Sequence, residues 1–170
     1  MTVLNRNPVN TGPLQPTKFL LTFSRISAVQ YFCQTVNLPG VQLGEVVRAT
    51  PFLDMYSPGT KLTYNNLDIS FIIDSEMAGW KNLYNWFTSI ADPDGFEKRD
   101  GSIELQRSKH FSDATLTILS SLNNPMLRIN FTNLFPVSMG DIRFDTTSSA
   151  DTIITVDASF RYQSYVYLTA

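Results

Sequence analysis

Side chains that bind metals or act as nucleophiles are scarce in this sequence of 170 residues. It contains one cysteine, Cys33, and one histidine, His110. One thiol cannot form an internal disulfide, and one thiol with one imidazole cannot supply the four ligands of a structural zinc site. Cys33 lies in an apolar run with no histidine nearby in sequence, which favours a packed core thiol over a nucleophile. A lone cysteine also fits a reducing cytoplasm.

Motifs that carry catalysis or bind cofactors are also missing. The sequence has no G-x-S-x-G, no G-x-G-x-x-G and no phosphate-binding P-loop. Asp92, Asp94 and Asp100 lack the spacing of an EF-hand, and turn chemistry explains the first two. We therefore expect no enzyme activity, no cofactor and no metal.

Charge and long hydrophobic runs are scarce as well. Charged residues make up 16% of the chain and the net charge is -2, so no overall basic field would attract nucleic acid. No stretch approaches the roughly 20 apolar residues of a membrane helix, and none resembles a signal peptide. The twelve Phe and seven Tyr suggest surface that partner subunits cover, although a surface rich in Ser, Thr and Asn explains the low charge equally well.

The main pattern in the sequence is the alternation of hydrophobic and polar residues. From Asn66 to Ala91 a predicted strand runs directly into a predicted helix. Leu67, Ile69, Phe71 and Ile73 share one face of the strand, which is the period of a half-buried strand. Asp74 or Ser75 is expected to cap the helix, with Glu76 near its positive end. The expected apolar stripe of the helix consists of Met77, Trp80, Leu83, Tyr84, Phe87, Ile90 and Ala91.

Further strands are predicted on both sides of this unit. Residues 18–26 and 29–36 are expected to form a hairpin around Ser27-Ala28. The longest strand is expected at 152–168, with a bulge near Ser164. The fold class is mainly β: an antiparallel β sandwich or barrel with one flanking helix. Residues 1–16 form an extended N-terminal arm, either disordered or reaching a neighbouring subunit, and residues 17–170 form one domain. The remaining strands are predicted at 41–49, 113–121 and 126–134, the last ended by Phe135-Pro136.

A second hairpin is predicted between Pro51 and Thr63, with its tip at Ser57-Pro58-Gly59. Large apolar side chains flank the tip and belong to no clear sheet face. The hairpin therefore either projects as an interaction element or folds flat on its own core. The sequence favours these two alternatives almost equally.

Several segments follow one another in a recognisable order: the turn Leu38-Pro39-Gly40, the projecting hairpin, the strand–helix LDISFIIDSEMAGWKNLYNWF, then LRINFTNLFPVSMGDIRFD and the final TIITVDASFRYQSY. The most specific pieces are the closing aromatic strand and an aromatic–proline pair followed by Gly-acidic-Ile, at Phe135, Pro136, Gly140, Asp141 and Ile142. In this order of elements the chain resembles the tail tube proteins of contractile-tailed, T-even-like bacteriophages. The resemblance covers about residues 18–165, excluding the polar loop 96–112.

The resemblance implies a virion protein that assembles in the host cytoplasm. Hexameric rings would stack into a rigid tube that penetrates the host envelope and conducts viral DNA. Implied partners are further copies, the tail sheath protein, baseplate and tail terminator rings, and a tape-measure protein and DNA in the lumen, without sequence-specific DNA binding. A baseplate tube-initiator or tube-end ring of the same fold is an alternative.

Three sets of residues are expected to form contacts or surfaces of such a tube. An inter-ring hairpin would use Val47, Phe52, Leu53, Met55, Tyr56, Pro58 and Leu62. A sheath-facing side of the helix would present Lys81, Asn82, Asn85 and Ser89. Because long alternating strands would line a lumen with their polar faces, we expect some of Asp68, Ser70, Asp157, Ser159 and Arg161 there.

A different class of protein stays open from the residues alone. A generic β-sandwich binding module, for instance for carbohydrate, would need an exposed aromatic platform. Trp80 and Trp86 are the candidates if they point outward, although Trp80 falls on the apolar stripe.

Overall fold

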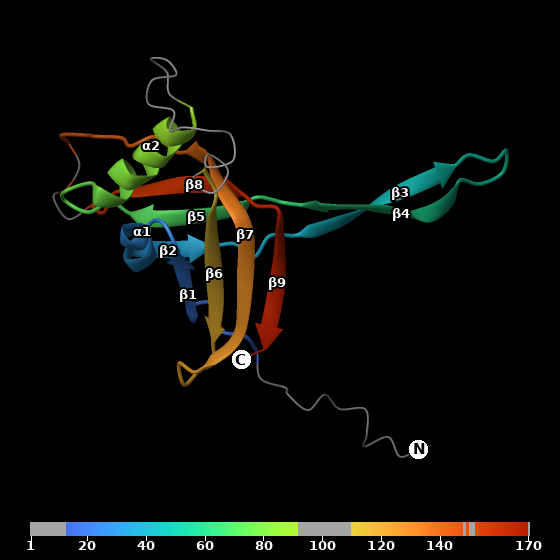
Figure 1. Cartoon of the computed structure of the whole chain (residues 1–170), viewed down its shortest axis with the longest axis horizontal. Coiled ribbons are helices and arrows are strands. Elements are labelled where there is room, and N and C mark those ends of the chain that lie inside the picture. Colours follow the sequence, from blue (N-terminus) through green and yellow to red (C-terminus); the bar gives the residue numbers. More distant parts are fainter. Residues whose placement is uncertain (1–12, 92–109, 148, 150–151, 170) are drawn as a thin grey trace.

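The computed structural model describes residues 13–91, 110–147, 149 and 152–169, with two helices and nine strands (Figure 1). The predicted arm 1–16 and loop 96–112 lie largely outside these residues. In chain order the elements are β1 (Phe19–Phe23), α1 (Ser27–Phe32), β2 (Cys33–Val36), β3 (Val41–Arg48), β4 (Met55–Tyr64), β5 (Leu67–Ile72), α2 (Ala78–Ile90), β6 (Ser112–Leu119), β7 (Pro125–Met139), β8 (Thr155–Arg161) and β9 (Ser164–Thr169).

Two sheets cross at a large angle and share strand β7 (Figure 1). Sheet I consists of β1, β6, the first part of β7 and β9; sheet II consists of β2, β5, β8 and the last part of β7. All pairings are antiparallel. Such crossed packing needs a strand that bends from one sheet into the other, and β7 is that strand. The predicted antiparallel β sandwich is confirmed.

The bend in β7 lies at Asn133, whose φ of 54° is left-handed. Its backbone N–H donates to the Asp113 carboxylate at 3.1 Å. We expected Phe135-Pro136 to end this strand, and that was wrong, because Pro136 pairs with Phe160 of β8. A proline is tolerated there because this part of β7 is an edge of sheet II.

The predicted long strand 152–168 is two strands. β8 pairs with β5 and β7 in sheet II, and β9 pairs with β7 in sheet I. The chain changes sheets at Tyr162 and Gln163, where the Gln163 backbone N–H donates to the Thr132 carbonyl at 3.0 Å. The phase change near Ser164 therefore marks a corner between sheets rather than a bulge.

The first predicted hairpin was also wrong. Residues 27–32 form helix α1, and β2 pairs with β5 instead of with β1. Ile26 and Val29, three residues apart, are both buried in the core. That is a helical spacing, which the expected strand alternation did not take into account.

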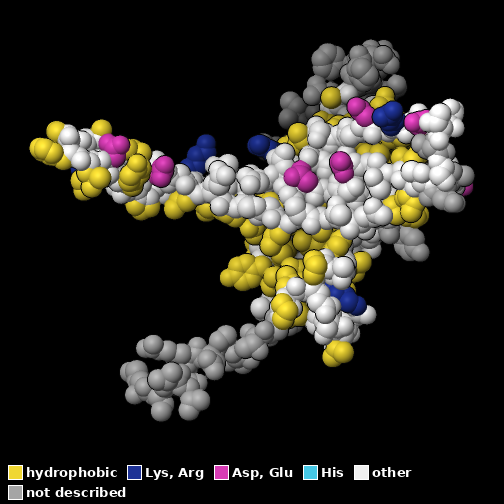
Figure 2. Space-filling view, turned by 180° about the vertical axis from the view of Figure 1, so that it is seen from behind, with side chains coloured by type: hydrophobic (Ala, Val, Ile, Leu, Met, Phe, Trp, Pro, Cys, Tyr) yellow, Lys and Arg dark blue, Asp and Glu magenta, His cyan; other side chains and the backbone are white. Residues whose placement is uncertain are grey.

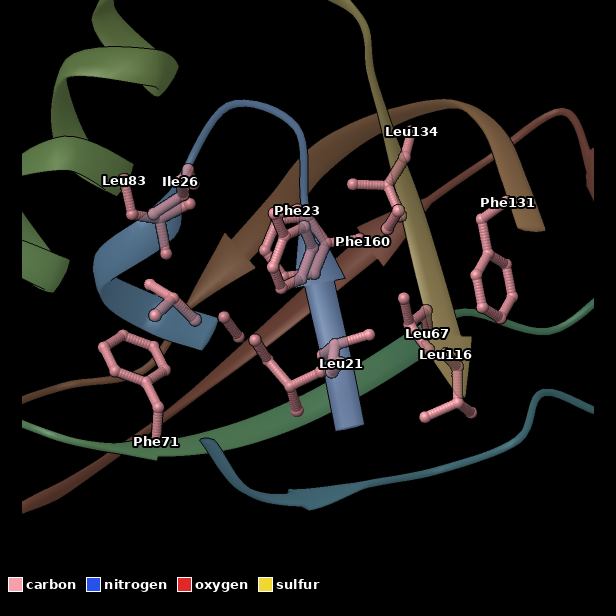
Figure 3. Packing of buried hydrophobic residues seen from close by; sticks show 14 of the residues in the cluster. Leu21, Phe23, Ile26, Leu67, Phe71, Leu83, Leu116, Phe131, Leu134 and Phe160 are labelled. Carbon is pink, nitrogen blue, oxygen red and sulfur yellow. The ribbon is translucent and has the colours of Figure 1, made fainter. Parts of the chain in front are cut away.

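The core fills the space between the two sheets and helix α2 (Figure 3). Sheet I contributes Leu21, Phe23, Leu116 and Phe131, and sheet II contributes Leu67, Phe71 and Phe160. The Phe23 and Phe160 rings lie 5.4 Å apart, so the two sheets meet directly at this point. A continuous aromatic and aliphatic core of this kind is enough to hold one domain together.

Helix α2 is rotated relative to the predicted stripe. Its buried residues are Gly79, Leu83 and Trp86, whereas Tyr84 is 46% exposed. A Cβ on Gly79 would lie 3.4 Å from the Phe71 ring, so this glycine sets how closely the helix approaches β5. The predicted caps were wrong: Met77 is the N-cap, with a φ of 54°, and no side chain caps the helix.

Candidate assembly surfaces

The β3–β4 hairpin projects from the domain as a separate two-stranded sheet (Figure 1). Of the two alternatives left open by the sequence, the hairpin therefore projects and does not fold flat on its own core. The tip lies at residues 49–54, not at Ser57-Pro58-Gly59, which belong to β4. The Thr50 hydroxyl closes the tip by bonding the Leu53 carbonyl and by accepting from the Leu53 N–H at 3.2 Å.

One face of the hairpin is almost entirely apolar. Because cross-strand partners share a face, the register places Val41 with Tyr64, Leu43 with Leu62, and Val47 with Tyr56. Only the pair Glu45–Pro58 interrupts this row. The other face carries the pairs Gln42–Thr63, Val46–Ser57 and Arg48–Met55.

The tip adds two further apolar side chains. Phe52 is 99% exposed and Leu53 is 72% exposed. Figure 2 shows hydrophobic side chains along one rim of the hairpin and at its end. A two-stranded hairpin whose apolar face is not covered by the described part of the chain is marginal in water, so this face is a candidate interaction surface.

A bulge lies in the middle of the hairpin. The register shifts between Leu43 and Glu45, and the extra residues belong to β4. A Cβ on Gly59 would lie 2.6 Å from the Gly44 carbonyl oxygen, so no other residue fits without moving the backbone. Bulges of this kind bend and twist a ribbon. The outer half of the hairpin is thus held at a set angle to the inner half.

The root of the hairpin is fixed by an aromatic cluster, formed by Tyr64, Phe131, Tyr162 and Tyr165. Tyr64 lies 5.4 Å from Tyr165 and 5.8 Å from Tyr162, measured between ring centroids. The Tyr165 hydroxyl donates to the Pro39 carbonyl at 3.5 Å, so both strands of the hairpin are tied to the domain.

Tyr162 is the buried member of this cluster. Its hydroxyl has no hydrogen-bond partner among the described residues. Burial, together with the neighbouring Tyr165 and Tyr64, raises the pKa of Tyr162 to about 12. A buried hydroxyl without a hydrogen-bond partner lowers the free energy of unfolding, so Tyr162 destabilises the fold relative to phenylalanine at this position.

The five residues predicted to line a lumen lie on one face of sheet II, opposite the core. Asp68 is paired with Ser159 and Ser70 with Asp157 across β5 and β8. The Ser159 hydroxyl bonds the Asp68 carboxylate, and the Arg161 Nε donates to the Asn66 side chain at 3.0 Å. The register also places Thr35 of β2 and Ser138 of β7 in these rows.

Both edges of sheet II lack a partner within the described part of the chain. β2 pairs only with β5, and residues 135–139 of β7 pair only with β8. Cys33 lies on the β2 edge, half-buried, and burial raises the pKa of its thiol to about 11. The sequence predicted a packed core thiol, and Cys33 is packed against the core only in part.

The predicted outer face of α2 is mostly as expected. Lys81, Asn82 and Asn85 are exposed. Ser89 is half-buried instead, because its hydroxyl donates to the Trp86 carbonyl at 2.7 Å and accepts from Arg25 at 3.4 Å. The exposed surface also includes Tyr84, whose ring stacks on Trp80 at 5.2 Å.

A paired-tryptophan platform for carbohydrate does not exist. Trp86 is 1% exposed, and its indole N–H donates to the His110 carbonyl at 2.9 Å. The guanidinium carbon of Arg25 lies 5.3 Å from the centroid of the Trp86 ring. Burial of the Arg25 guanidinium removes part of its hydration and lowers the pKa of Arg25. His110 therefore contributes a backbone carbonyl to the core. Within the described ranges no group of His, Cys, Asp and Glu could hold a metal ion.

Sequence reasoning missed which strands form the open edges of sheet II, and it missed the aromatic cluster at the hairpin root. Both depend on strand order, which pairs β5 with β8 and β7 with β9 across large sequence distances. The one available signal was the aromatic spacing Tyr162, Tyr165 and Tyr167 near the C-terminus. No helix among the described residues is long and apolar enough to cross a membrane.

Comparison with solved structures finds the same fold in contractile injection systems. The tube-terminating cap of the anti-feeding prophage matches with a TM-score of 0.69 and 16% identity over 100% of both chains. A chain of the sheath–tube complex of the extracellular contractile injection system PVC matches with a TM-score of 0.62 and 16% identity over 93% of each chain. A chain of the PVC sheath/tube terminator matches with a TM-score of 0.65 and 14% identity, over 95% of this chain and 100% of that one.

No curated protein sequence matches the chain. A model of the phage tail tube protein family matches residues 10–168, nearly the whole sequence. The two crossed sheets, the flanking helix and the projecting hairpin agree with that match. The chain therefore belongs to the phage tail tube protein family.

Proposed function

We propose that the chain is the ring subunit of the rigid inner tube of a contractile, T-even-like phage tail. Six copies form a ring, and rings stack into a tube that penetrates the host envelope and conducts viral DNA. Family membership makes the chain a structural component of a tail or injection particle rather than an enzyme. The protein would assemble in the host cytoplasm before joining the virion.

The observation that carries this proposal is the architecture of sheet II. Its four strands alternate in direction, from β2 through β5 and β8 to residues 135–139 of β7. When a copy is rotated about a ring axis, its β2 runs antiparallel to the β7 edge of its neighbour. The sheets of successive copies can therefore join into one closed antiparallel barrel, which pairs both open edges of sheet II.

The exposed face of sheet II would line the lumen. Per copy it offers the carboxylates of Asp68 and Asp157, the guanidinium of Arg161, and the hydroxyls of Ser70 and Ser159. This mixed, weakly acidic lining would let polyanionic DNA pass without sticking, and would likewise accommodate a tape-measure protein. A lining rich in Lys and Arg would retain DNA instead.

The hairpin and helix α2 would face the other partners. The hairpin, with Val47, Phe52, Leu53, Met55, Tyr56, Pro58 and Leu62, extends beyond the domain and would reach an adjacent ring (Figure 1). The exposed side of α2, with Lys81, Asn82 and Asn85, would face the tail sheath protein. Ser89 would take part only through its effect on the local structure.

A ring at one end of the tube is the second candidate, either a baseplate initiator or a terminator. The favouring observation is that a cap and a terminator are among the similar structures, with TM-scores of 0.69 and 0.65. An end ring would bind another ring on one face only.

Negative-stain electron microscopy of the purified protein tests both candidates. A tube subunit should give six-fold rings that stack into hollow tubes without limit as concentration rises. An end ring should give single rings or pairs of rings. A protein that stays monomeric at all concentrations would contradict the proposal.

A further inference from the structure

The apolar core face of sheet I extends past the cover that sheet II provides. Cross-strand pairing places Leu21, Leu116 and Ile129 in one row, and all three are buried. The next row along the strands holds Phe19, Ile118 and Leu127, which are only half-buried. Sheet II therefore covers the apolar face of sheet I as far as the first row and leaves the second row partly exposed.

Tyr167 of β9 lies at the end of the buried row. It pairs with Ile129 and therefore points to the same face of sheet I, yet it is 69% exposed. We name the four side chains Phe19, Ile118, Leu127 and Tyr167 the ledge. Tyr165, two residues before Tyr167 on the same face, contacts Tyr64 at the hairpin root. Figure 2 shows hydrophobic surface continuing from the hairpin onto the domain below its root.

We infer that the ledge is the seat for the β3–β4 hairpin of an adjacent copy. This inference rests on the proposed self-assembly and names the surfaces that meet. The ledge carries no charged side chain, and the hairpin brings an apolar face with Glu45 as its only charge. The two surfaces are thus of the same chemistry, and neither is fully covered by the described part of its own chain.

The hairpin is large enough to cover the ledge. Its apolar face and tip carry seven exposed large apolar side chains, among them Phe52 and Leu53. β3 has eight residues and is therefore about 26 Å long, at roughly 3.3 Å per residue. The ledge spans four neighbouring strands about 4.8 Å apart, so β3 is longer than the ledge is wide. The hairpin can therefore cover the whole ledge and still place its tip beyond it.

The contact joins two different patches of the surface. Each copy offers one hairpin and receives one hairpin, so the interface is head-to-tail. Head-to-tail contacts produce closed rings or open helical tubes, whereas a self-complementary patch would end at a dimer. Hairpin-on-ledge contact therefore accounts for continued assembly from a single kind of subunit.

Substitution of Tyr167 tests the inference against a matched control. Val166 is the neighbouring residue on β9, 55% exposed, and pairs with Asn130 on the opposite face. Tyr167→Glu should raise the concentration needed for assembly about tenfold or more, because it buries an unpaired charge. Val166→Glu should change it by less than about twofold. Sedimentation velocity gives these concentrations, and thermal unfolding checks that both variants fold.

Cross-linking between two variants tests the contact itself, in a Cys33→Ser background. One population carries Tyr56→Cys on the apolar face of the hairpin or Ser57→Cys on the opposite face. The other carries Tyr167→Cys or Val166→Cys. With a short bis-maleimide, only Tyr56→Cys mixed with Tyr167→Cys should give cross-linked dimers in high yield.

The outcomes distinguish the ledge as the seat of the hairpin from the proposed tube function. Tubes that form normally with Tyr167→Glu, or equal yields from all four cysteine pairs, would overturn the ledge as the seat while the tube function stands. A wild-type protein that never assembles would overturn both.

Discussion

The sandwich body and the β3–β4 hairpin use side chains of similar hydrophobicity but bury them very differently. In the body, Phe71, Phe131 and Phe160 are fully buried between two sheets. In the hairpin, Phe52 and Leu53 stand almost free in solvent, and no residue of β3 is buried. The body covers its apolar faces within the described part of the chain, whereas the hairpin leaves its apolar face exposed, which is why we propose that another copy covers it. Stability and assembly should therefore respond to separate sets of mutations.

The largest effect on stability should come from the body. Phe160→Ala removes a ring that packs on Phe23 and Trp86, and should lower the free energy of unfolding by about 3–5 kcal/mol. Urea unfolding followed by tryptophan fluorescence measures this. A loss below about 1 kcal/mol would mean that the body does not depend on this core.

The hairpin should show the reverse behaviour. Replacing Val46–Ser57 by Gly-Gly removes the outer half of the hairpin beyond the Glu45–Pro58 pair. Assembly should be abolished, while the free energy of unfolding of the monomer stays within about 1 kcal/mol of wild type. Sedimentation and urea unfolding on the same sample test both halves. Tubes of normal length from this variant would contradict the role of the hairpin.

A smaller effect should follow from Gly59→Ala. The new Cβ would collide with the Gly44 carbonyl, so the bulge must rearrange and the outer half of the hairpin changes direction. We expect weaker assembly with an unchanged thermal unfolding temperature. Gly44→Ala is the matched control, because a Cβ there meets its nearest atom, the Lys61 carbonyl oxygen, at 3.5 Å. Equal assembly of the two variants would show that the bulge does not set the direction.

The smallest effect concerns Tyr162→Phe, which removes the buried hydroxyl that has no partner. Stability at neutral pH should stay the same or rise by up to about 1 kcal/mol. The pKa of Tyr162 is about 12 in the fold against 10 in the unfolded chain, so the unfolded chain loses this proton first. Ionisation of Tyr162 therefore leaves the free energy of unfolding unchanged below pH 10 and lowers it as the pH rises from 10 towards 12.

Thermal unfolding of wild type and Tyr162→Phe between pH 8 and 11.5 checks this. Wild type should lose stability more steeply above pH 10 than the variant. Cys33, with a pKa of about 11, contributes equally to both proteins and cancels in the comparison. Parallel curves for the two proteins would contradict the burial of Tyr162.

Period-two alternation identified β5, β6 and β8 correctly, because these strands have one buried and one solvated face. It failed at α1, where Ile26 and Val29 follow helical spacing over only six residues. It also failed along β7 and at the β8–β9 corner, where the chain changes sheets and the buried side changes with it. The polar face of sheet II could be read from alternation, whereas the ledge could not, since it depends on where one sheet ends over another.

The measurement that tests the central claim most directly is amide hydrogen exchange of monomeric and assembled protein. The account predicts slow exchange for β5, β6, β7 and β8 in both states. It predicts fast exchange for β3 and β4 in the monomer and strong protection of the same strands after assembly. Hairpin amides that exchange equally fast in both states would contradict the claim that another copy covers the hairpin.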